Sequence, residues 1–270
     1  MRVRLGGEDG DEEFSNLLMS IGNGTLENTN GVITIPSSLG TIVNSQEELI
    51  ARVYEGIHDL PNLQSLWLCD RAILTPTNEC ASEINTKILA LFVSEERTYL
   101  SINTALSQDD AVHYPAEFLD SVTASGLPAH AITVKVGAPI LLLRNLNAPK
   151  LCNGTRLRVR ALHRNVIEAE ILTGCGIGES VFIPRIPMIA TNYPFEFKRV
   201  QFPISICFAM TINKSQGQTL ACAGLELSRS DCFSHGQLYV ACSRVKTSNS
   251  LFIHAPEGRT HNVVYQEVLL

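Results

Sequence analysis

The hydrophobic pattern of this chain changes period twice, and this change constrains the fold more than any other feature. Apolar residues keep helical spacing or form short continuous runs near both ends, whereas the middle of the chain alternates with a period of two. Segments 140–145, 154–162, 165–172 and 179–186 predict short strands, which are separated by turns rich in Gly and Asn. The pattern predicts one α/β domain, residues 1–134 and 201–270, interrupted by a small antiparallel β module or barrel at residues 135–200.

Within the α/β part, a strand followed by a polar loop and a helix is predicted twice. Residues 72–74 predict a strand that stops at Pro76, and a polar start at Thr77 or Asn78 introduces a helix that continues toward Phe92. The apolar run Ser205–Ile212 predicts a second buried strand, followed by a polar turn. Further helices are predicted at 12–21, 46–57 and 236–245, and a strand at 250–255. In such folds, ligands bind at the C-terminal edge of the parallel sheet.

Composition excludes several classes of protein. The 270 residues are 45% hydrophobic and 18% charged, which is typical of a folded chain and excludes disorder as the main state. No run of 18 apolar residues exists, so we expect no membrane partner. The eight cysteines are scattered and form no CxxC pair, so we expect reduced thiols and no metal site.

The net charge of −6 conceals an uneven distribution along the chain. Residues 1–134 carry a net charge of −13, residues 135–200 carry +6, and residues 201–270 carry +1. Only the middle segment is basic. It could hold a phosphate backbone locally, and on charge alone a solvated basic face without a ligand is equally compatible.

Three groups of residues stand out as candidates for chemistry. The turn Thr211–Leu220 follows a predicted strand and offers amides, hydroxyls and carboxamides for phosphates or sugars, or it is an ordinary loop. Arg244 ends an apolar helical segment, where it could reach a phosphate or simply be a surface residue favoured by the helix dipole. Leu74–Asn78, with Asn85 further along the helix, could contact a nucleic-acid backbone, or Thr77 or Asn78 could only cap the helix.

Together these blocks resemble the C-terminal half of the Pif family of superfamily-one DNA helicases, above all the helicase part of Helitron-type transposons. The resemblance is carried by LTPTNECASEIN, VGAPILLLRNLNAPKLCNGTRLRV, FIPRIPM, RVQFPISICFAMTINKSQGQTL and GQLYVACSRVKTSNSLFI. It implies a second RecA-like motor domain, residues 1–134 and 201–270, and an SH3-like module called 2B at 135–200.

The resemblance also implies roles for single residues. Arg244 would contact the γ-phosphate of ATP, and Arg2 in the opening MRVRL would lie toward the nucleotide. The motif that couples DNA contact to nucleotide state would include Asn213, which stands where relatives often have His. The implied nucleotide-side positions are Gln216, Gly217, Gln218 and Thr219. The implied contacts to single-stranded DNA are Thr75, Pro76, Asn78, Asn85, Asn153, Gly154, Thr211, Asn213, Lys214 and Ser215.

The sequence contains no P-loop: its Lys residues followed by Ser or Thr are Lys214 and Lys246, and neither is preceded by Gly. The family resemblance therefore implies that ATP and Mg²⁺ would be bound mainly by a first RecA-like domain, which would precede this chain. We expect part of a 5′-to-3′ helicase that is inactive alone and nuclear. The alternatives are a non-catalytic remnant that still binds single-stranded DNA, or a protein-interaction module, for which the insert has few aromatic residues.

Overall fold

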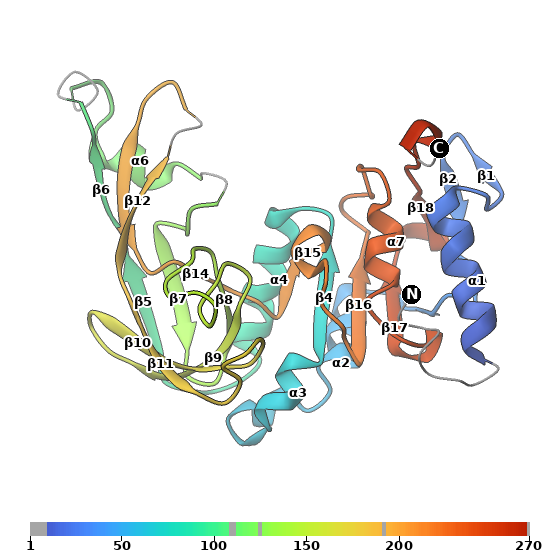
Figure 1. Ribbon diagram of the computed structural model, residues 1–270, viewed down its shortest axis with the longest axis horizontal. Helices are drawn as coiled ribbons and strands as arrows, with labels where there is room; N and C mark the ends of the chain where they lie inside the picture. Colours follow the sequence, from blue (N-terminus) through green and yellow to red (C-terminus); the bar gives the residue numbers. More distant parts are fainter. Residues whose placement is uncertain (1–9, 108–111, 124–125, 191–192, 269–270) are drawn as a thin grey trace. The chain divides into compact units, whose positions relative to one another are not determined.

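The computed structural model describes residues 10–107, 112–123, 126–190 and 193–268, and the chain divides into two compact units (Figure 1). The first unit comprises the residues up to His58, 66–91 and 208–270, and the second comprises 59–65 and 92–207. The predicted insert, 135–200, therefore starts too late. Strand β5 (Glu96–Leu100) pairs antiparallel with β7 (Ala131–Lys135), and these hydrogen bonds join the segment before residue 135 to the second unit.

The first unit is built on a five-stranded sheet in which every neighbouring pair of strands is parallel, in the order β15-β4-β16-β17-β3. The strands are β3 (Thr41–Ile42), β4 (Arg71–Thr75), β15 (Ala209–Thr211), β16 (Cys222–Glu226) and β17 (Leu251–His254). Strand β4 lies inside the sheet, and its residues 72–74 are fully buried. This burial explains its continuous apolar sequence, since a strand covered on both faces needs no polar side.

Helices and a smaller sheet complete the first unit. The α-helices are α1 (Gly10–Asn23), α2 (Gln46–Val53), α3 (Ser65–Cys69, whose first residue belongs to the second unit), α4 (Asn78–Ala90) and α7 (Gln237–Cys242). The small antiparallel sheet contains β1 (Asn28–Thr29), β2 (Val32–Thr34) and β18 (Arg259–His261). The 3-10 helices are η2 (Ile57–Asn62, shared between the two units), η3 (Ile212–Ser215), η4 (Ser248–Ser250), η5 (Pro256–Gly258) and η6 (Gln266–Val268).

Helix α2 packs directly on the sheet because Gly224 of β16 leaves room for it. A Cβ atom at residue 224 would lie 2.8 Å from Val53 Cγ2 and 3.2 Å from Leu49 Cδ1, two buried side chains of α2. At its N-terminus, α2 is capped by Ser45, whose hydroxyl accepts from the Glu48 amide. The glycine thus sets how closely helix and strand approach.

The predicted helices exist, with shorter or longer bounds. Helix α1 extends two residues beyond the predicted 12–21 at each end and stops before Gly24, whose positive φ of 67° ends it as expected from the Gly-Asn-Gly turn. Helix α2 ends at Val53 rather than at 57, and Gly56 follows with a φ of 81°. Helix α7 covers only Gln237–Cys242, since Gly236 adopts a left-handed conformation and belongs to the preceding turn.

The predicted single strand Ser205–Ile212 was wrong. Strand β14 (Ile204–Ile206) pairs antiparallel with β8 of the second unit, whereas β15 pairs parallel with β4 of the first. The chain passes from one unit to the other between Cys207 and Phe208, and both residues are buried. An apolar run has the same appearance whether one sheet or two bury it, so periodicity could not detect this division.

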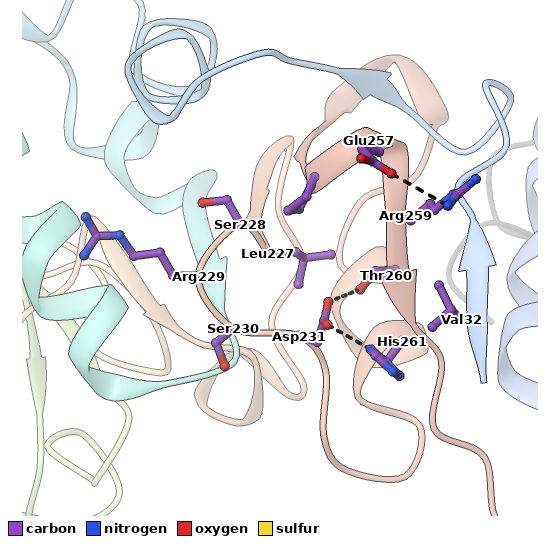
Figure 2. Close-up of a pocket in the computed structure, with 11 residues that line it drawn as sticks. Val32, Leu227, Ser228, Arg229, Ser230, Asp231, Glu257, Arg259, Thr260 and His261 are labelled. Atoms are coloured by element: carbon purple, nitrogen blue, oxygen red, sulfur yellow. Dashed lines mark hydrogen bonds and ion pairs between the residues drawn. The ribbon is translucent and has the colours of Figure 1, made fainter. Parts of the chain in front are cut away.

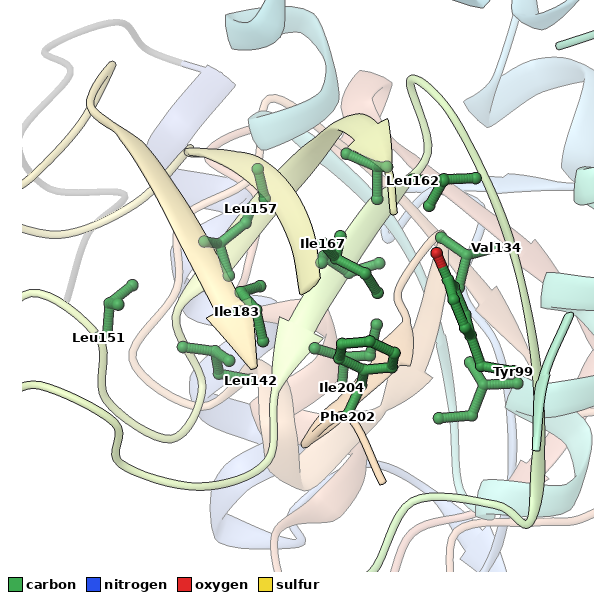
Figure 3. Packing of buried hydrophobic residues seen from close by; sticks show 14 of the residues in the cluster. Tyr99, Val134, Leu142, Leu151, Leu157, Leu162, Ile167, Ile183, Phe202 and Ile204 are labelled. Atoms are coloured by element: carbon green, nitrogen blue, oxygen red, sulfur yellow. The ribbon is translucent and has the colours of Figure 1, made fainter. Parts of the chain in front are cut away.

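The second unit contains antiparallel sheets, and its buried apolar side chains form a large cluster around Tyr99 and Phe202 and a smaller one around Phe195 and Phe197. Its main sheet has the order β11-β10-β9-β8-β14, which confirms the predicted meander. Its elements, besides β5, β7 and β14, are β6 (Ile102–Ala105), α6 (Ala116–Ser121), β8 (Pro139–Leu142), β9 (Arg156–Leu162), β10 (Val166–Ile171), β11 (Ser180–Pro184), β12 (Ile186–Ala190) and β13 (Phe197–Gln201). Figure 3 shows Tyr99 and Phe202 packed among aliphatic side chains of the large cluster; their ring centroids are 4.8 Å apart.

No helix in the described part of the chain is long and apolar enough to cross a membrane.

Candidate functional site

The two predicted ligand loops lie side by side in the first unit. Strands β4 and β15 are parallel neighbours, and Thr75 is directly opposite Thr211 in the register. Both strands therefore end at the same edge, where residues 76–78 follow β4 and η3 follows β15. We call this edge, residues 75–78 and 211–219, the loop edge.

The loop edge presents a mixed set of exposed polar groups. Lys214 Nζ lies 3.4 Å from Asn78 Oδ1, so the ammonium of one loop meets the carboxamide of the other. Gly217, with a φ of 87°, turns the chain back after η3, and the Gln218 amide donates to Ser215 O at 2.9 Å. The candidate side chains that are exposed or half-buried here belong to Asn78, Asn213, Lys214, Gln216, Gln218 and Thr219, together with the backbone of Gly217.

Four residues at this edge that the resemblance implies as DNA contacts are buried. Thr75 and Ser215 are fully buried, and their hydroxyls donate to carbonyl oxygens of Thr77 and Ile212 at 2.8 and 2.7 Å. Pro76 and Thr211 are buried as well. Because these side chains are covered by the protein, they shape the two loops and do not offer surface groups to a ligand.

Asn85, in helix α4, is also buried and bonded to the protein. It is 6% exposed, its Nδ2 donates to Ala209 O at 2.9 Å, and its Oδ1 accepts from the Ala209 amide at 2.8 Å. This reciprocal pair fastens helix α4 to the first residue of β15. Asn85 therefore helps to position the loop edge, and its carboxamide is directed into the unit rather than toward solvent.

Thr77 caps helix α4, which confirms the capping alternative for this residue. Its hydroxyl accepts from the Cys80 amide at 3.5 Å, so Asn78 is the first helical residue and its side chain remains exposed. Burial in the first turn raises the pKa of the Cys80 thiol to about 11, and the charges of Glu226 and Glu83 add to this. The thiol is therefore protonated near neutral pH and is a poor nucleophile.

Arg244 lies behind the loop edge and is only 9% exposed. Its Nη1 donates to the carbonyl oxygens of Gln218 and Ser215 at 3.2 and 3.4 Å, and its Nε donates to Val240 O at 2.7 Å. Its Nη2 donates to Ser243 Oγ at 2.7 Å. The surface-residue alternative for Arg244 was thus wrong, because the guanidinium joins the end of α7 to the turn after η3.

Three remaining candidate residues lie elsewhere. Asn153 and Gly154 belong to the second unit, where Asn153 is exposed and its amide donates to Asn145 Oδ1 at 2.7 Å. Gly154 has a φ of 88°, and its amide donates to Leu142 O at 2.9 Å, so this glycine allows the tight turn before β9. Arg2 lies outside the described residues.

A second polar site, which the sequence analysis missed, is a groove of about 310 Å³ in the first unit. Loop 227–231 follows β16, and its Asp231 accepts hydrogen bonds from Thr260 and faces His261 Nδ1 at 2.8 Å (Figure 2). Across the groove, Glu257 pairs with Arg259 at 3.7 Å. The signal was the polar run Ser228–Asp231 directly after a buried strand. Since these charges pair with one another, the groove offers a ligand less than the loop edge does.

Comparison with known proteins identifies the relatives of this fold. Residues 117–162, within the second unit, match the family model described as the 2B domain of DNA helicase Pif1. Human ATP-dependent DNA helicase PIF1 is 29% identical over 163 residues, which are 59% of this chain and 25% of that protein. The Xenopus laevis protein of the same name is 33% identical over 124 residues, 44% of this chain and 19% of that protein. The chain is thus similar to Pif1 helicases, and the part that matches their 2B domain is residues 117–162.

Solved structures of Pif1 helicases share the fold. The crystal structure of Pif1 from Candida albicans superimposes with a TM-score of 0.62 at 18% identity, covering 96% of this chain and 57% of that one. Pif1 from Bacteroides, in complex with ADP-AlF3 and ssDNA, gives 0.61 at 21% identity, covering 97% and 52%. The predicted RecA-like α/β class is thereby confirmed. The chain spans about a quarter or less of the length of the curated relatives described above.

Proposed function

We propose that this chain is part of a Pif1-family 5′-to-3′ DNA helicase, binds single-stranded DNA on the loop edge and supplies the arginine side of the ATP cleft. The observation that carries the proposal is the meeting of Asn78 and Lys214 at one sheet edge, with Arg244 directly behind the same loop. The Bacteroides relative, whose structure is a complex with ADP-AlF3 and ssDNA, supports both ligand classes.

The chemistry of the loop edge suits a nucleic-acid backbone. An ammonium group, carboxamides and backbone amides donate to phosphate oxygens and sugar hydroxyls without reading the base sequence. Lys214 would supply the charge and Asn78 a directed hydrogen bond. Since parallel-sheet proteins bind ligands at the C-terminal ends of their strands, the location agrees with the chemistry.

The residues on the nucleotide side fit a phosphate in part. Arg244 carries a planar guanidinium that stays charged at any relevant pH, and Gln216–Thr219 form the adjacent exposed turn. Arg244 would have to exchange carbonyl partners for phosphate oxygens when ATP binds. The sequence holds no P-loop, so a first RecA-like domain outside it would supply most of the ATP and Mg²⁺ ligands.

Fluorescence anisotropy with a labelled oligothymidylate tests DNA binding by the loop edge. We expect salt-sensitive binding, and we expect Lys214→Ala to weaken it and to lower the slope of log K against log[salt] by about 0.7. Arg259→Ala is the matched control, because it removes one exposed cation of the same unit that is already paired with Glu257. Equal losses in the two variants, or no binding at low salt, would refute the loop edge as the DNA site.

A non-catalytic DNA-binding remnant is the second candidate, and the engagement of Arg244 by protein carbonyls favours it. Both candidates predict no DNA-stimulated ATP hydrolysis by the isolated chain, because the P-loop is missing from the sequence. They differ once the chain is joined to a Pif-family first RecA-like domain. If the chain is a helicase region, the joined protein should hydrolyse ATP, and Arg244→Ala should abolish this hydrolysis. If the chain is a remnant, the joined protein should not hydrolyse ATP. Nuclear localisation stays a prediction from the resemblance.

A further inference from the structure

The surface cations of the second unit fall into two groups. Lys135, Lys150 and Arg160 each have a carboxylate partner, which is Glu96 at 3.5 Å, Glu179 at 2.8 Å and Glu170 respectively. Five others, Arg97, Arg144, Arg164, Arg185 and Lys198, have no carboxylate within ion-pair distance in the described part of the chain, and the arginines at 97, 164 and 185 are linked through Tyr99. A cation that is already neutralised by a carboxylate contributes little to binding a polyanion, so the cations of the second group are the stronger candidates for such binding.

Two of these arginines flank the same aromatic ring. The Arg97 guanidinium carbon lies 5.9 Å from the ring centroid of Tyr99, and that of Arg185 lies 5.7 Å from it. Arg97 Nη1 donates to Leu162 O at 3.4 Å, and Arg185 Nη1 donates to Leu100 O at 2.7 Å. The two side chains are therefore held by carbonyls and by the ring, which lowers the entropy they would lose on binding a ligand.

The third arginine lies in a turn fastened to the same tyrosine. Tyr99 donates its hydroxyl hydrogen to His163 O at 2.8 Å, and the His163 amide donates to Val166 O at 3.1 Å. This fixes the tight turn between β9 and β10, in which His163 and Arg164 are both exposed. We call Arg97, His163, Arg164 and Arg185 the Tyr99 patch.

The acidic residues nearby oppose the patch only weakly. In strand β5, Glu96 alternates with Arg97, so it projects from the opposite face, where it pairs with Lys135. Glu95 acts on Tyr99, but burial is the larger cause of the raised pKa of that phenol, and Arg97 and Arg185 act against the rise.

We propose that the Tyr99 patch binds the phosphate backbone of a nucleic-acid strand, as a second contact surface of this chain besides the loop edge. The patch deepens the proposed function and rests on it for the identity of the partner. Guanidinium groups suit phosphates because their planar fork donates two parallel hydrogen bonds to one anion. The Tyr99 ring that two of the arginines flank is only 3% exposed, so a base cannot stack on it and the contact is with the backbone.

The test compares two double variants that each remove two positive charges from the second unit. Arg97→Gln with Arg164→Gln takes unpaired cations from the patch, and Lys150→Gln with Arg160→Gln takes ion-paired ones. Anisotropy with a labelled oligothymidylate is measured from low to physiological salt. We expect the patch variant to bind roughly tenfold more weakly at low salt, with the salt slope lower by about 1.4, and the control to stay within about twofold of the parent.

Several outcomes would overturn the patch as a DNA contact. Equal losses in both double variants would show a general charge effect, and an unchanged salt slope would show that the patch meets no phosphate. Competition by polyglutamate as strong as by unlabelled DNA of equal charge would point to an acidic protein segment. Arg185→Gln, which removes the guanidinium whose carbon lies 4.9 Å from the ring centroid of Phe202, serves as an independent single variant, and thermal unfolding checks that each protein is folded. Because the Lys214 comparison is separate, the patch can fail while the loop edge stands.

Discussion

At the scale of single residues, Arg244 is the position whose environment says most about how the shape of the loop edge depends on a phosphate contact. Its guanidinium donates to backbone carbonyls on both sides of the turn after η3, at Ser215 and Gln218. A hydrogen bond from a charged donor contributes about 1.5–3 kcal/mol. Holding the loop and contacting a phosphate would require the same donors, so the position of Arg244 and the shape of the loop depend on each other.

Arg244→Ala should therefore loosen the loop edge in the absence of any nucleotide. We expect amide hydrogen exchange at Gly217 and Gln218 to become at least about tenfold faster, since losing these bonds lowers the free energy of local opening by more than about 1.4 kcal/mol. Lys246→Ala, at an exposed position two residues further on, should leave the exchange rates unchanged. If Arg244→Ala exchanges at the parent rate, the guanidinium does not hold this loop.

At the scale of elements, side chains between helix and sheet set the position of the loop edge. Asn85 joins α4 to β15 through both polar atoms of its carboxamide. Gly224 lets α2 lie against β16 at a distance that no larger residue permits. Each contact joins residues distant in sequence, so helix and strand propensities alone do not specify the edge.

Gly224→Ala should destabilise the first unit by about 1–3 kcal/mol, because its methyl group would lie 2.8 Å from Val53 Cγ2. Val53→Ala alone should also destabilise, by leaving a cavity. The double variant should lose less free energy of unfolding than the sum of the two, since each change relieves the other. Urea unfolding measures all three values, and strict additivity would show that the helix moves away instead.

At the scale of the whole molecule, buried thiols in the first unit link stability to pH. Burial is the main cause that raises the pKa of Cys80 to about 11 and that of Cys232 to about 12, from an ordinary value of 9.0. Burial raises the pKa of Cys242 as well. The folded protein keeps these protons at a pH where the unfolded chain releases them, so the stabilisation is complete below pH 9.0 and is lost as pH rises toward the folded pKa values.

We expect the free energy of unfolding to fall above pH 9.0 by about 1.4 kcal/mol per pH unit for each such thiol. Urea unfolding between pH 8 and about 10.5 measures the slope. Other groups titrate in this range, so the comparison is with Cys80→Ala combined with Cys232→Ala, which should be less stable but should depend less steeply on pH. Parallel curves for the parent and the double variant would contradict the assignment.

Local pattern alone was sufficient for the strand-loop-helix order around residues 71–90, the glycine stop of α1 and the meander of the second unit. These features depend on neighbours in sequence, through caps, turns and periodicity. The resemblance to Pif helicases followed from ordered blocks of residues in the same way, and the comparisons found the same similarity. The extent of the second unit did not follow, because the pairing of β5 with β7 joins segments more than thirty residues apart.

The sequence by itself determined which residues could form the loop edge, and only the tertiary structure decided which of them face solvent. Thr75, Asn85, Ser215 and Arg244 are polar residues at a strand end, in helices and in a loop, yet packing covers all four and gives each a partner in the protein. Conversely, the three arginines of the Tyr99 patch stood apart in the sequence. The reason is that exposure and pairing are properties of contacts between distant segments, and no local pattern encodes those contacts.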